Sequence, residues 1–222
     1  MAITKRPGVT AAPAFGTLAQ RPASAFGPQL YFVTDVGMAG FWSFWDVAAS
    51  RWRAVGNEFI LYSLNAAVLH GGGTGVTERL ANAVIPAGLI AAGDQMEVVS
   101  AVHVSTLANS VPTQKLRLGT AGTTSDAEIN STSLPSTTGM HGGFSAPYVF
   151  ESLTAIRLLQ ALGASAQIAS GATASAPVTI PNLASNALNL GLFYTNNDTT
   201  GGPETHNPTC RLFQVKIRTV GA

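Results

Sequence analysis

The side chains that could carry chemistry are few and scattered along the chain. The four histidines show no His-x-x-x-His spacing, although neighbouring strands could bring two of them together around a metal ion. His103 alternates with Val102 and Val104, as expected in a strand. The other three stand beside Gly or Asn in segments typical of loops: His70, His141 and His206. The pattern favours structural histidines and predicts no metal site.

The acidic residues and the cysteine form no recognisable catalytic pattern. Two carboxylates that lie close together in space could cleave a glycosidic bond. The spacing of the acidic residues along the chain does not favour such a pair. The acids considered are Asp94, Asp126, Glu128, Glu151, Asp198 and Glu204. Turns closed by Asx hydrogen bonds explain Asp94 and Asp198, with a calcium site as a minor alternative. Cys210 begins the last predicted strand and is interpreted as a core thiol. We predict a non-enzymatic protein; the enzyme alternative is a depolymerase or another glycosidase.

The glycine run from Gly71 to Gly75 suggests a phosphate loop only superficially. No Lys-Ser or Lys-Thr follows it, and no helix start is evident, so the cation that holds a phosphate is missing. We interpret residues 71–77 as a hinge and predict no cofactor.

Composition narrows the classes of partner. Charged residues make up 10% of the chain, against about 25% in an ordinary soluble domain. The formal net charge is +1, from 12 basic and 11 acidic residues, so no basic stripe points to nucleic acid or to an anionic membrane surface. Such a neutral surface favours self-association and coverage by partners. The longest apolar run, near residues 84–92, is too short to span a bilayer, and the N-terminus lacks the apolar core of a signal peptide.

Two modules are predicted before the hinge. Four prolines in residues 1–28 favour an extended docking arm. Residues 29–70 contain strand-like runs and the turn dipeptide Gly56-Asn57, and are interpreted as a small β-meander for attachment. Its aromatic side chains could stack on a sugar, but we favour packing in the core or against a subunit. The candidate docking or packing aromatics are Tyr31, Phe41, Trp42, Trp45 and Trp52.

Residues 78–222 are predicted to form one antiparallel, jelly-roll-like β-sandwich, so the fold class is all-β. Strand runs are expected at 78–85, 95–105, 114–118, 148–152, 154–160, 186–194 and 209–219. Residues 153–162 also fit a helical period, but a strand is favoured. In the last run, Phe213, Val215 and Ile217 share one face.

Two long polar segments, 119–147 and 195–208, are predicted to be exposed recognition loops, because loops on a rigid sandwich can vary without unfolding it. The candidate recognition residues there and beside them are Tyr194, Asn196, Asn197, His206 and His141.

Several short motifs resemble proteins of tailed bacteriophages. The first set resembles a short module common in tail fibres, and comprises Arg21-Pro22, Gly27, Leu30-Tyr31, Thr34-Asp35, Gly37, and Trp45 or Trp52. The second set is similar to phage jelly-roll domains of fibre and head-decoration proteins, and comprises Ile85-Pro86-Ala87-Gly88, Ala92-Gly93-Asp94 and the strands that end at Arg211 to Thr219. Together the two resemblances cover most of the chain.

The resemblance implies a virion structural protein, assembled from a chain made in the host cytoplasm. It implies a homotrimer on the virion surface that contacts other tail or capsid proteins and attaches to the host, with a host-surface glycan as a further partner. The alternative is a capsid decoration or head-fibre protein, and a third reading is a non-viral carbohydrate-binding module. The chain lacks heptads and collagen-like repeats, so a compact knob is expected rather than a rod.

Overall fold

The computed structural model describes residues 14–23, 29–37, 40–64, 68–69, 77–104, 112–133, 140–143, 145–159, 176–196 and 208–220. Within these ranges the regular structure is strand, with one 3₁₀ turn at Leu18–Gln20, and the all-β prediction is confirmed. No helix in this part of the chain has the length and apolar character that crossing a membrane requires. The strands are β1 (Ala14–Gly16), β2 (Leu30–Val33), β3 (Phe41–Asp46), β4 (Arg51–Ala54), β5 (Glu58–Leu64), β6 (Val68–Leu69), β7 (Thr77–Ile85), β8 (Gln95–Val104), β9 (Thr113–Gly119), β10 (Ala127–Ser133), β11 (Met140–Gly142), β12 (Ser145–Ser152), β13 (Ala155–Leu158), β14 (Val178–Thr179), β15 (Leu188–Thr195) and β16 (Pro208–Arg218).

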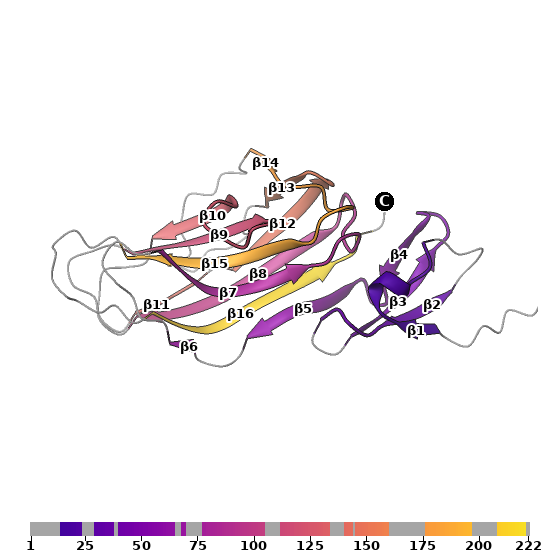
Figure 1. Cartoon of the computed structure of the whole chain (residues 1–222), viewed down its shortest axis with the longest axis horizontal. Helices are drawn as coiled ribbons and strands as arrows, with labels where there is room; N and C mark the ends of the chain where they lie inside the picture. Colours follow the sequence, from indigo (N-terminus) through magenta and orange to yellow (C-terminus); the bar gives the residue numbers. More distant parts are fainter. Residues whose placement is uncertain are drawn as a thin grey trace, which may run out of the picture.

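The larger part of the molecule is a jelly roll. One sheet has the order β5-β16-β8-β12-β13-β14, and the facing sheet has the order β7-β15-β9-β10 (Figure 1). Eight of these strands make up the sandwich and can be numbered 1 to 8 in chain order: β5, β7, β8, β9, β10, β12, β15 and β16. In this numbering one sheet has the order 1-8-3-6 and the other has the order 2-7-4-5. This is the strand arrangement of a jelly roll, which confirms the predicted sandwich.

Alternating side chains build the core between the two sheets. Phe213, Val215 and Ile217 of β16 are fully buried, as their shared face predicts. Met96 and Val98 of β8 lie opposite them in the same sheet and are buried on the same side. Within the segment 153–162, which also fits a helical period, residues 155–158 form strand β13, so the helical alternative is wrong for these residues.

Two strands lie inside the segment 119–147, which we predicted to be a recognition loop. β10 was missed because its sequence is polar and offers Ile129 as its one large apolar residue. A register shift between Glu128 and Asn130 also breaks the alternation. β10 is an edge strand with one solvated face, so polar residues are tolerated there.

The N-terminal residues form a separate small sheet with the order β1-β2-β3-β4. β1 pairs in parallel with β2 at the edge, within the segment predicted to be an extended arm. β5, which the sequence interpretation grouped with this meander, instead pairs with β16 over Glu58 to Leu64. The boundary before the hinge therefore differs from the sheet boundary, because β5 finds its partner in a strand about 150 residues away.

The molecule has two unlike ends (Figure 1). The small sheet lies beside the β7–β8 connection and the end of β16, where Arg51 contacts Asp94 and Val220. At the opposite pole, β5, β8, β10 and β15 all end, at Leu64, Val104, Ser133 and Thr195. The predicted hinge 71–77 lies almost wholly outside the described residues.

Candidate functional site

The small sheet has one buried face and one exposed face. Direct cross-strand partners share a face, so Tyr31, Val33, Phe41 and Trp45 lie together on one side, and each is at most 8% exposed. The ring of Phe41 stacks on Phe59 of β5, with centroids 4.2 Å apart. This contact joins the small sheet to the core of the sandwich in one continuous apolar cluster.

The other side of the small sheet carries apolar side chains that the described residues leave exposed or half-buried. We call it the aromatic face, and it consists of Phe15, Leu30, Phe32, Trp42 and Phe44. Phe15 is 78% exposed, and Leu30 and Trp42 are 47% and 43% exposed. The rings of Phe32 and Trp42 contact each other at a centroid distance of 5.0 Å. Adjacent exposed apolar side chains typically mark a surface that contacts another molecule.

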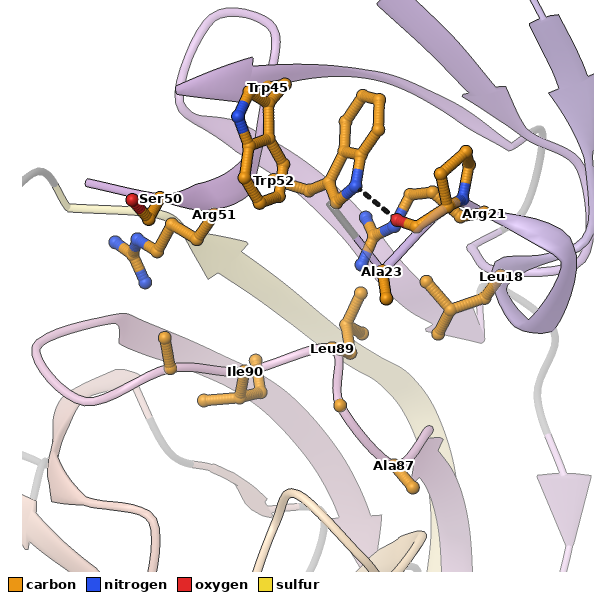
Figure 2. A pocket seen from close by; sticks show the side chains of 13 residues that line it. Leu18, Arg21, Ala23, Trp45, Ser50, Arg51, Trp52, Ala87, Leu89 and Ile90 are labelled. Atoms are coloured by element: carbon orange, nitrogen blue, oxygen red, sulfur yellow. Dashed lines mark hydrogen bonds between the residues drawn. The ribbon is translucent and has the colours of Figure 1, made fainter. Parts of the chain in front are cut away.

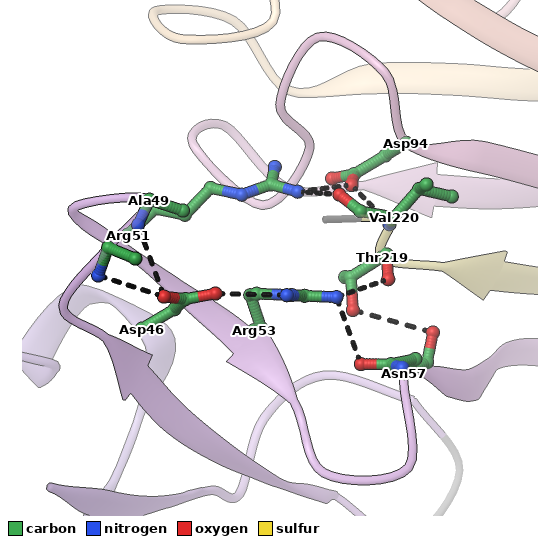
Figure 3. Close-up of polar contacts among 9 residues, drawn as sticks. Asp46, Ala49, Arg51, Arg53, Asn57, Asp94, Thr219 and Val220 are labelled. Atoms are coloured by element: carbon green, nitrogen blue, oxygen red, sulfur yellow. Dashed lines mark hydrogen bonds and ion pairs between the residues drawn. The ribbon is translucent and has the colours of Figure 1, made fainter. Parts of the chain in front are cut away.

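An ion pair fixes the position of the small sheet (Figure 3). Arg51 of β4 donates from Nη2 to Oδ1 of Asp94, at 3.0 Å, and also donates to the carbonyl oxygen of Val220. Asp94 is 1% exposed, and its carboxylate also accepts from the backbone N–H groups of Ala91 and Val220. One carboxylate thus ties together the edge of the small sheet, the β7–β8 connection and the end of the chain.

Arg53 adds a second tie next to the first (Figure 3). Its guanidinium donates to Asp46 Oδ2 at 2.9 Å, to Asn57 Oδ1 at 3.1 Å and to the carbonyl of Thr219 at 3.3 Å. The hydrogen bond from Arg53, followed by those from backbone N–H groups, lowers the pKa of Asp46. The same guanidinium lies 5.8 Å from the centroid of Phe44, so this tie also borders the aromatic face.

A cavity of about 310 Å³ lies between the small sheet and the β7–β8 connection (Figure 2). Trp52 points into it and donates from Nε1 to the carbonyl oxygen of Pro22, at 2.7 Å. The Arg21 guanidinium lies 5.6 Å from the centroid of the Trp52 ring, and burial lowers the pKa of Arg21 to about 10. Because Arg21 already covers one face of this ring, Trp52 acts as a packing residue of the junction.

The candidate docking or packing aromatics therefore have different positions. Tyr31, Phe41 and Trp45 are buried in the core, and Trp42 alone of the five lies on the aromatic face. The list of candidate aromatics left out Phe15, Leu30, Phe32 and Phe44. Residues 30 and 32, and residues 42 and 44, are each two positions apart in a strand, so their side chains lie on the same face of the sheet. This spacing is the sequence signal that could have grouped them.

The described members of the predicted recognition set do not form an exposed surface. Tyr194 and Asn196 are buried, at 1% and 0% exposure, so they are not surface residues. They follow the inward alternation of β15, which continues to its end. Asn197 and His206 lie outside the described residues, and His141 lies in β11 opposite His103 of β8 in the register.

The described acids serve separate structural contacts. Asp126 accepts from backbone N–H groups of residues 121–123, Glu128 pairs with Lys115 and Arg117, and Glu151 pairs with Arg157. Among the residues that the structure describes, no three of His, Cys, Asp or Glu form a group that could hold a metal ion. Asp198 and Glu204 lie outside these residues.

Comparisons with known proteins give a weak likeness in fold. No model of a protein family and no curated protein matches the chain. A solved structure titled "Structure of infectious bursal disease virus Gt strain" is similar with a TM-score of 0.40 and 11% identity, over 89% of this chain and 41% of the other. A crystal structure of the T13 particle of the same virus has a TM-score of 0.39 and 12% identity, over 83% and 38%. This chain spans less than half the length of these viral chains, and at such TM-scores the likeness carries no argument about function.

Proposed function

We propose that the protein is a non-enzymatic structural component of a tailed-phage virion, present on its surface as a trimeric receptor-binding protein of the tail. The observation that carries this proposal is the aromatic face at one end of a jelly roll whose strand ends form the opposite pole. In this proposal the aromatic face docks on the particle and the other pole points towards the host.

The physical support is the cost of leaving the aromatic face in water. Burial of apolar surface is worth roughly 25 cal/mol per Å², so a protein that keeps Phe15 78% exposed gains from a partner that covers it. The two arginine ties hold the small sheet on the sandwich, so docking through the sheet would orient the whole molecule. Jelly rolls recur in viral capsid and lectin domains, in agreement with this role.

Trimerisation is the part of the proposal that the neutral surface supports. With 10% charged residues and a net charge of +1, charge repulsion between copies is weak. Sedimentation equilibrium of the purified chain tests this. A mass of three chains is the expected result, and a monomer at every concentration would overturn the trimer.

The virion role is tested by gold-labelled antibodies against this protein on intact phage particles. Label at the tail or at fibre tips is the expected result. Label spread over the head would replace the receptor-binding role with capsid decoration, in which the same aromatic face would clamp on capsomers. Particles without label, while the protein is present in the infected lysate, would overturn the virion role altogether.

A further inference from the structure

The outer face of the sheet β7-β15-β9-β10 carries a cavity of about 340 Å³ with an unusual lining. The cavity is lined by side chains from all four strands and from the β9–β10 connection, and five of them carry hydroxyl groups and two are cations: Thr77, Thr113, Thr124, Ser131, Thr195, Lys115 and Arg117. Binding cavities for small molecules are usually lined by apolar and aromatic side chains. This polar, cationic lining therefore favours a polar ligand over an apolar one.

The polar groups are fixed in position by the sheet beneath them. Thr113, Lys115 and Arg117 alternate along β9 with core residues that face inwards and are fully buried: Gln114, Leu116 and Leu118. The hydroxyl groups of Thr77 and Thr195 lie 2.8 Å apart across β7 and β15. Arg117 donates from Nη1 to the carbonyl oxygen of Asp126 at 2.8 Å. A ligand would meet an array that is already ordered, which lowers the entropic cost of binding.

The charges in the cavity do not cancel. Lys115 Nζ and Arg117 Nη2 both contact the same oxygen of Glu128, Oε2, at 3.0 Å and 2.9 Å. Among the described residues, these two cations share one carboxylate, so the three side chains together carry a formal charge of +1. The side chains of Lys115 and Glu128 are 30% and 35% exposed, so an anion from solvent can reach them.

We infer that this cavity binds an acidic saccharide, that is, a sugar that carries a carboxylate or sulfate group. The unbalanced cation would pair with the acidic group, and the ring of hydroxyl groups would exchange hydrogen bonds with the hydroxyl groups of the sugar. The volume lies at the lower end of the usual range for ligand pockets, roughly 300 to 1,000 Å³, which suits a short saccharide. The inference rests on the proposed function, since it names the class of host-surface ligand.

The position of the cavity agrees with this role. Thr77, Thr113 and Thr195 form one cross-strand row at the end of β15, at the pole opposite the small sheet. A protein docked through its aromatic face would keep this row exposed to the host side.

The test is isothermal titration calorimetry of the full chain at low salt and pH 7. The probes are methyl β-glucuronide, methyl β-glucoside and sodium sulfate. We expect the glucuronide to bind with a Kd on the order of 1 mM and the neutral glucoside at least about tenfold more weakly. Sulfate that binds as tightly as the glucuronide would reduce the cavity to a general anion site and overturn the saccharide assignment.

Three variants separate the cavity from effects on folding. Glu128→Gln removes the competing carboxylate and is expected to tighten glucuronide binding about fivefold, which a damaged fold would not do. Lys115→Gln is expected to weaken it about fivefold. The matched control is Lys216→Gln, on the outer face of the other sheet, because Lys216 is 32% exposed and also pairs with glutamates, Glu58 and Glu97. It is expected to change nothing.

The outcomes also separate this inference from the proposed function. Glucuronide affinity that is unchanged in both Glu128→Gln and Lys115→Gln would overturn the binding site, even if virions carry the label. Virions without label would overturn the proposed function, even if the purified protein binds the glucuronide as expected.

Discussion

Arg51 Nη2 lies 3.0 Å from Oδ1 of Asp94, and this contact is one of those that join the edge strand of the small sheet to the jelly roll. Asp94 is the more deeply buried partner, with 1% of its side chain exposed against 19% for Arg51. Two backbone N–H groups, of Ala91 and Val220, complete the shell around the carboxylate. The buried negative charge of Asp94 therefore contributes to the orientation of the aromatic face, together with the Arg53 hydrogen bond to Thr219 and the stack of Phe41 on Phe59.

Asp94→Asn is expected to destabilise the protein by about 2 to 4 kcal/mol, because it leaves Arg51 without its counter-ion in a largely buried setting. Urea unfolding followed by tryptophan fluorescence measures this change. Glu151→Gln is the matched control, because its ion pair with Arg157 is about one-third exposed on both sides and is worth about 1 kcal/mol or less. Equal effects of the two substitutions would contradict a special role for Asp94.

Trp42→Ala and Trp45→Ala are expected to separate docking from folding. Trp45 is 7% exposed, so its truncation should cost about 3 to 5 kcal/mol of unfolding free energy. Trp42 is 43% exposed, so its truncation should cost about 1 kcal/mol or less, yet sharply reduce incorporation into particles. Incorporation is measured by complementing a phage that lacks the gene and blotting the purified virions. Normal incorporation of Trp42→Ala would argue that the aromatic face is not the docking surface.

Gly191→Ala is expected to destabilise the protein by about 1 to 3 kcal/mol. A Cβ atom at this position would lie 2.5 Å from Cε2 of Phe193, whose ring covers Gly191 on β15 and is 3% exposed. The double variant Gly191→Ala with Phe193→Leu removes the colliding ring atoms. In a double-mutant cycle, the loss from Gly191→Ala should be smaller in the Phe193→Leu background, and purely additive effects would show that the ring and the glycine do not interact.

Stability is expected to fall as the pH rises above about 9. Burial raises the pKa of Cys210 from 9.0 to about 11, and burial with the nearby carboxylate of Glu78 raises the pKa of Tyr194 from 10.0 to about 12. Between the unfolded-state and folded-state pKa of each group, the unfolded chain loses a proton that the folded chain keeps. Ionisation therefore stabilises the unfolded state, and the free energy of unfolding falls as the pH rises. Each group contributes at most about 1.4 kcal/mol per pH unit.

Urea unfolding at pH 8 to 11 checks this dependence. Tyr194→Phe should flatten the decline above pH 10. It should cost little at pH 7, because the Tyr194 hydroxyl has no hydrogen-bond partner within the described residues. A curve that is flat up to pH 11 in the unmodified protein would show that neither group is buried in solution.

Local sequence patterns predicted much of the jelly roll. The alternation of Phe213, Val215 and Ile217 identifies the last strand and its buried face, because a period of two follows from strand geometry alone. The same pattern failed for β10, where a bulge at Ile129 and a solvated outer face remove the alternation. It also failed to show that Tyr194 and Asn196 face inwards, because the polar residues from 195 onwards suggested a loop.

By itself, the sequence determined the all-β class, the approximate strands and the low content of charged residues, because each depends on composition or on neighbours along the chain. Only the tertiary structure decided that β5 pairs with β16, that Trp42 rather than Trp45 faces outwards, and that Lys115 and Arg117 share Glu128. These relationships depend on strand register and on which face of each sheet is covered. Register brings together residues that are distant in sequence, and no local pattern encodes that choice.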